Sequence, residues 1–142
     1  MGINYLEKLN ETFFELLEDL IRVFPSDGDF RIYSMAVETA LTLDDAFLFN
    51  IIQKKIIVYE PQILARDEEF MVNFDVASNL DSSPDKVKQT VVHVIQKLRS
   101  LWHVISESDK DVVWKYLRTI VLLYQKCKTT LVIGAEQPNV TI

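Results

Sequence analysis

The sequence predicts an all-α protein: an irregular bundle of five to six helices with a C-terminal antiparallel helical hairpin and an extended tail. Glycine occurs three times and proline four times in 142 residues, which is too few for the many turns of an all-β domain. Apolar residues recur every three or four positions through most of the chain, as on one face of a helix. Two such segments near the C-terminus are separated by a short linker, which is typical of an antiparallel pair.

The length suits one domain with one hydrophobic core. We expect residues 1–128 to form this single helical domain and residues 129–142 to form a C-terminal tail. The tail lacks a helical period and contains Gly134 and Pro138, which both disfavour a helix interior.

The first half of the chain predicts three helices. Residues 4–24 carry an apolar stripe that stops at a proline-containing turn. A second helix is expected over 29–42, with Asp29 as its N-cap. A third is expected over 45–59, with Pro61 ending it. The β-branched residues near the end of this third segment also fit a strand.

The second half contains the clearest helical patterns. Short helical turns are expected within 62–74, followed by a loop over 78–84 that is rich in Ser, Asp and Pro. Long apolar stripes then run through 84–105 and 108–128, with Ser108 as the N-cap of the last helix.

Charge is distributed unevenly along the chain. Residues 1–83 contain 6 basic and 16 acidic residues, a net charge of −10, whereas residues 84–142 contain 9 basic and 5 acidic residues, a net charge of +4. The two halves could attract each other within one fold, or the basic half could dock on an acidic partner. A net charge of +4 is too small to predict strong phosphate binding.

The titratable residues form no recognised catalytic or metal-binding motif. His93 and His103 are about 15 Å apart along one expected helix, at 1.5 Å per residue. Cys127 is the single cysteine, and the carboxylates at 67–69 lack the spacing of a calcium loop. We therefore expect no catalytic residues, no cofactor and no bound metal.

The same features predict the compartment. One cysteine cannot form an internal disulfide, and the N-terminal residues do not resemble a signal peptide. No apolar run approaches the roughly 18 residues of a membrane span. We expect an intracellular protein that is not secreted and does not enter a membrane.

One group of residues suggests an interaction surface. Trp114 falls near the edge of the apolar stripe of the last helix, close to the basic residues Lys115 and Arg118. A tryptophan at such an edge is a good anchor for a protein partner. Together with Val132 and Ile133 of the tail, these residues form the surface that we expect to contact a partner.

Three stretches resemble a family of small helical proteins of those nucleocytoplasmic large DNA viruses that infect algae and protists. They are residues 13–30 (FFELLEDLIRVFPSDGDF), 67–70 (DEEF) and 101–125 (LWHVISESDKDVVWKYLRTIVLLYQ). The resemblance covers most of residues 5–126 and rests on the Pro–Asp turn and on the Ser-Glu-x-x-Lys-Asp-x-x-Trp-Lys-Tyr-Leu stretch. It implies a viral origin, a helical fold and a location in the host cytoplasm or the virion. The family has no assigned activity, so no functional residue carries over.

These observations favour a non-enzymatic protein-interaction or assembly protein, either a minor virion component or a viral adaptor. Its partner would be another protein or further copies of itself. Two alternatives stay open. The basic C-terminal half, where aromatic and basic residues intermix, could bind nucleic acid weakly, and an enzyme could carry a site that no sequence motif reveals.

Overall fold

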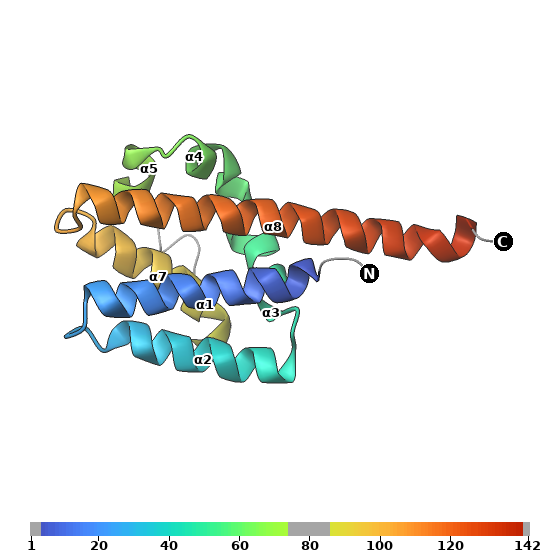
Figure 1. Ribbon diagram of the computed structural model, residues 1–142, viewed down its shortest axis with the longest axis horizontal. Helices are drawn as coiled ribbons and strands as arrows, with labels where there is room; N and C mark the ends of the chain where they lie inside the picture. Colours follow the sequence, from blue (N-terminus) through green and yellow to red (C-terminus); the bar gives the residue numbers. More distant parts are fainter. Residues whose placement is uncertain (1–3, 74–85, 141–142) are drawn as a thin grey trace.

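The computed structural model describes residues 4–73 and 86–140, and within the second range the side chains of residues 90–130. Every element in these ranges is helical and none is a strand, which confirms the predicted all-α class (Figure 1). In chain order, the elements are α1 (Tyr5–Val23), α2 (Asp29–Leu43), α3 (Phe47–Ile51), the π-helix η1 (Ile52–Ile56), the 3₁₀-helix η2 (Ile57–Tyr59), α4 (Glu60–Leu64), α5 (Glu68–Asn73), α7 (Lys86–Leu101) and α8 (Glu107–Val140).

Helix α1 forms where its apolar stripe and its cap predict it. The Asn4 side chain accepts a hydrogen bond from the backbone N–H of Glu7 at 3.0 Å, which satisfies one of the free amides of the first turn. The helix ends before Pro25, as expected. Its buried face lies against the core and consists of Leu9, Phe13, Leu16, Leu17 and Leu20.

The start of α2 differs from the expected cap. Gly28 occupies the N-cap position, and the Asp27 carboxylate accepts from the backbone N–H of Asp29 at 3.0 Å. The Asp29 carboxylate is instead 2.8 Å from Lys97 Nζ on α7, and Asp27 is 2.9 Å from the same nitrogen. The Asp29 carboxylate, which we assigned to the cap, therefore forms an ion pair with Lys97 of a distant helix instead.

The expected third helix is divided into several short elements. Residues 47–64 pass from α-helix through a π-helical turn and a 3₁₀ turn into α4, and the β-branched residues of this segment do not form a strand. Pro61 does not end a helix, which corrects our expectation, because it lies in the first turn of α4. A proline fits there because first-turn amides need no intrahelical acceptor. The changes of helix type let Ile52, Ile56 and Ile63 all reach the core.

Two short helices, α4 and α5, occupy the region where short helical turns were expected. Asp67 begins α5 by accepting from the backbone N–H of Phe70 at 3.3 Å. The expected loop over 78–84 lies outside the described residues.

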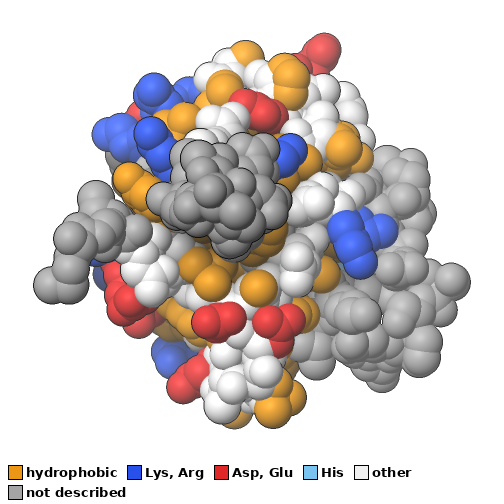
Figure 2. Space-filling view, turned by 90° about the vertical axis from the view of Figure 1, so that its right-hand side faces the viewer, with side chains coloured by type: hydrophobic (Ala, Val, Ile, Leu, Met, Phe, Trp, Pro, Cys, Tyr) orange, Lys and Arg blue, Asp and Glu red, His pale blue; other side chains and the backbone are white. Residues whose placement is uncertain are grey.

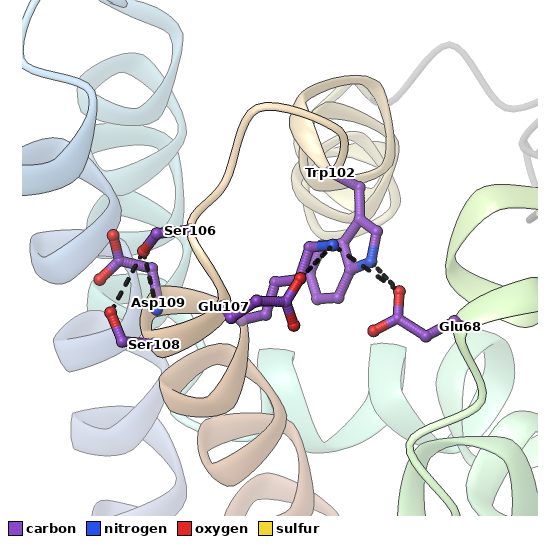
Figure 3. A network of polar contacts seen from close by, with 7 residues as sticks. Glu68, Trp102, Ser106, Glu107, Ser108 and Asp109 are labelled. Carbon is purple, nitrogen blue, oxygen red and sulfur yellow. Dashed lines mark hydrogen bonds and ion pairs between the residues drawn. The ribbon is translucent and has the colours of Figure 1, made fainter.

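The C-terminal hairpin is present but splayed. Helices α7 and α8 run in opposite directions and are joined by a short turn (Figure 1). However, α8 packs mainly along α1, and α7 packs mainly along α2. Ser106, rather than Ser108, caps α8, because its hydroxyl accepts from the backbone N–H of Asp109 at 3.2 Å (Figure 3).

The C-terminal segment differs from the extended tail that we expected. Helix α8 continues through residues 129–140 and projects beyond the body of the bundle (Figure 1). Extending an existing helix requires no new nucleus, so each added residue gains one hydrogen bond without repeating the cost of nucleation. Gly134 costs about 1 kcal/mol relative to alanine in a helix, and α8 nevertheless continues past it. Pro138 lies in the last turn of the helix.

Candidate functional site

Trp114, the expected surface anchor, lies in the core. Only 3% of its surface is exposed, and its ring meets that of Trp102 edge-on, with a centroid distance of 5.5 Å. Helix α8 is covered by α1 on one side and by α4 on another. Residues that flank the central stripe of α8 are therefore buried, which sequence periodicity alone does not reveal.

Trp102 lies at the centre of a cluster of polar and cation–ring contacts. The indole N–H of Trp102 donates to Glu68 at 2.5 Å, which joins the end of α7 to α5 (Figure 3). Lys110 Nζ lies 5.3 Å from the centroid of the Trp102 ring and 3.4 Å from Glu107. The cation faces the electron-rich ring, and the indole N–H meets a carboxylate. This arrangement connects three helices.

The structure does not bring the five expected interaction residues together. Lys115 and Arg118 are exposed on α8, whereas Trp114 faces inward. Lys115 is 2.9 Å from Asp111. Val132 lies about 27 Å along the helix from Trp114, at 1.5 Å per residue.

Val132 and Ile133 both belong to the part of α8 that projects past the body (Figure 1). The expected surface is therefore spread over separate regions of α8. Lys115 borders a cavity of about 300 Å³ between α1 and α8, and another cavity lies at the base of the projecting part of α8.

That cavity opens where α8 leaves the bundle and has a volume of about 280 Å³. We call it the α8 hollow. Figure 2 views the molecule along α8 from the C-terminal end of this helix and shows apolar side chains on that face. Three elements and their flanking residues supply its lining, which consists of Asn4, Tyr5, Leu6, Ala46, Phe49, Cys127 and Thr130.

The wall of the α8 hollow is firmly packed. Phe49 is buried and stacks on Tyr124, with a centroid distance of 5.0 Å. Cys127 is also buried, and this burial raises the pKa of its thiol. A protonated thiol is a weak nucleophile, so Cys127 serves here as a small apolar side chain. The hollow can therefore accept apolar groups, and its cysteine is not an activated nucleophile.

Sequence reasoning missed this hollow because its residues come from segments far apart in the chain. Cys127 was noticed only as the single cysteine. One feature of the sequence could have indicated the hollow. Tyr5 and Leu6 place an aromatic and an aliphatic side chain at the very start of a helix, before its main apolar stripe begins.

The remaining titratable residues do not assemble into a site in the part of the chain that the structure describes. No group of three or more His, Cys, Asp or Glu side chains there could hold a metal ion. His93 is half-buried with its ring 6.4 Å from that of Tyr33, and His103 is exposed. Among the described helices, none combines the length and apolar character that crossing a membrane requires.

Comparison with known proteins finds relatives that match only part of the chain. No family model and no solved structure matches the chain. Uncharacterized proteins of African swine fever virus, from a Malawi tick isolate and from the Badajoz strain, are each 34% identical to it over 71 residues. These residues are 50% of this chain and 49% of each relative, so the chain spans about half the length of the curated relatives that it matches. The virus has a large DNA genome, and the chain is thus similar to an uncharacterized protein of a large DNA virus.

Proposed function

We propose that the protein is a non-enzymatic interaction or assembly protein whose α8 hollow receives an apolar helix of a protein partner. The observation that carries this proposal is the open apolar cavity of about 280 Å³ at the base of the projecting part of α8. Exposed apolar surface of this kind is a common mark of a protein interface.

The arrangement of α1 and α8 indicates how a partner helix would lie. Within the body, α1 packs along α8 in the opposite direction, but α1 begins at Tyr5 whereas α8 runs on to Val140 (Figure 1). A partner helix antiparallel to α8 would continue the path of α1. It would cover the hollow and about 15 Å of α8 beyond Thr130, at 1.5 Å per residue.

We further propose a viral role. The likeness to proteins of African swine fever virus supports a viral origin. The resemblance of residues 13–30, 67–70 and 101–125 supports membership in the small helical protein family of nucleocytoplasmic large DNA viruses of algae and protists. In that setting, the protein acts in the host cytoplasm or the virion, as a minor virion component or an adaptor.

Nucleic-acid binding has less support because basic residues of the C-terminal half already face carboxylates. Lys97 is 2.9 Å from Asp27, and Lys110 lies within 4.0 Å of Glu68. These contacts favour the interpretation that the two oppositely charged halves attract each other within the fold.

A matched pair of substitutions tests the proposal. Thr129 and Thr130 are both exposed, and each hydroxyl bonds to a backbone carbonyl four residues earlier. Of the two, only Thr130 lines the hollow. Thr130→Trp should therefore obstruct the hollow, whereas Thr129→Trp adds the same bulk outside it.

The experiment captures partners of the full chain from infected or expressing cells and reconstitutes the complex from purified proteins. We expect Thr130→Trp to weaken binding at least about tenfold, a loss of about 1.4 kcal/mol, while Thr129→Trp binds like the unmodified chain. Equal binding by both variants would contradict docking in the hollow. Capture of nucleic acid that moderate salt removes would favour the basic half instead.

A further inference from the structure

A second apolar surface lies on the outer face of α2. Ile32, Met35 and Leu43 are 62%, 67% and 86% exposed, respectively. At 100° per residue, Ile32 and Leu43 are about 20° apart around the helix and Met35 is about 60° from Ile32, so all three share one face. Thr39 lies between them and turns its hydroxyl to the Met35 carbonyl at 3.0 Å. We call these four residues the α2 stripe.

The α2 stripe is separate from the face that anchors the helix. The opposite side of α2 carries Phe30, Val37 and Ala40 into the core. Helix α2 lies at one edge of the bundle, with its outer side away from α1 and α7 (Figure 1). Isolated exposed apolar residues are ordinary, but several on one helical face form a patch that can be covered by another molecule.

The charges beside the stripe indicate what covers it. Arg31 and Glu38 are exposed, and neither forms an ion pair with another described residue. Their seven-residue spacing places them about 20° apart on the same flank of the stripe. When two identical helices pair in opposite directions, the same flanks face each other. Arg31 of each copy then meets Glu38 of the other, and two-fold symmetry forms this pair twice.

The apolar residues fit the same register. With Arg31 facing Glu38 of the second copy, Ile32 lies opposite Met35 of that copy near the symmetry axis. Leu43 then reaches the turn that precedes α2 in the second copy, where Pro25 is exposed. We propose that the α2 stripe is a self-association surface, through which two copies of this chain pair their α2 helices antiparallel. This surface shares no residue with the α8 hollow, so either proposal can fail without the other.

Charge reversal tests this pairing in the full chain. The mass in solution, measured by sedimentation or light scattering over a range of concentrations, should approach twice 16.5 kDa for the unmodified chain. Either single variant, Arg31→Glu or Glu38→Arg, brings like charges together at both symmetric contacts of the dimer. Each should raise the dimer Kd about tenfold. The double variant R31E/E38R restores both pairs and should return the Kd to within about threefold of the original value.

Apolar substitutions provide a second arm. Met35→Asp should abolish the dimer, while Val104→Asp, at an exposed apolar residue outside the stripe, should leave it intact. Circular dichroism of each variant verifies that the fold is retained. An unmodified chain that stays monomeric at all concentrations overturns the proposal, as does a dimer that Met35→Asp leaves intact. Single charge reversals that change nothing, or a double variant that does not recover, overturn the antiparallel register.

Discussion

The contact between Tyr116 on α8 and Asp19 on α1 gives a prediction that can be worked out in detail. The Tyr116 hydroxyl donates to the Asp19 carboxylate at 2.6 Å and joins the two longest described helices. Tyr116→Phe removes this hydrogen bond with little change in shape. A hydrogen bond to a charged group stabilises a fold by about 1.5–3 kcal/mol. Because Asp19 is partly exposed, we expect a loss of about 1–2 kcal/mol in the free energy of unfolding.

The loss of stability caused by Tyr116→Phe should become smaller both at low pH and at high pH. The hydrogen bond from Tyr116 lowers the pKa of Asp19, so this contribution is present above the ordinary carboxyl range and disappears as pH falls through the folded-state pKa. Burial and the bond to Asp19 raise the pKa of Tyr116 to about 12. The protonated hydroxyl therefore stabilises the fold fully below about pH 10, and the effect is lost as pH rises towards 12. The difference between the proteins should be largest between about pH 5 and 9.

Urea unfolding followed by tryptophan fluorescence at several pH values measures this effect. Tyr124→Phe is a matched control on the same helix, because no hydrogen bond from the Tyr124 hydroxyl occurs among the described residues. We expect that variant to change stability by less than about 0.5 kcal/mol. An Asp19→Asn variant combined with Tyr116→Phe gives the coupling between the two side chains. The reasoning would be refuted by a Tyr116→Phe protein as stable as the original, or by a loss that does not vary with pH.

Two further predictions concern contacts between helices. Lys97→Met removes the cation that lies within 2.9 Å of both Asp27 and Asp29 and should cost about 1 kcal/mol at neutral pH. The hydrogen bond from Lys97 lowers the pKa of Asp27, so urea titrations should show this cost shrinking as pH falls below about 4, and a constant cost would contradict it. Trp102→Phe leaves a space in the core and removes the bond to Glu68, which should cost about 2–3 kcal/mol. Glu68→Gln keeps an acceptor and should cost less than about 1 kcal/mol, and equal losses in these two variants would show that core packing contributes little.

The positions of most helices could be predicted because their causes are local. Helix α1 follows from a stripe of leucines, from Asn4 before it and from Pro25 after it, and each of these acts within a few residues. The apolar stripe of α7 also forms a helix over the part that the structure describes, although this helix ends at Leu101 and not at residue 105 as expected. By contrast, a single expected helix over 45–59 became several short elements, because the isoleucines there must reach a core built by other helices.

The candidate sites were much less predictable than the helices. The periodic pattern placed Trp114 at the edge of a stripe, but α1 and α4 both cover α8, and the ring became part of the core. The α8 hollow depends on where α1 begins relative to α8. No pattern within either helix encodes this relative position.

The sequence by itself determined the all-α class, because scarce turn residues and helical spacing act through short-range hydrogen bonding and local burial. Only the tertiary structure decided that α8 packs along α1, that Asp29 pairs with Lys97, and that the face of α2 with Ile32 and Met35 stays uncovered. The physical reason is that a helical stripe specifies which side chains avoid water but not which surface covers them. That choice depends on how all the helices fit together.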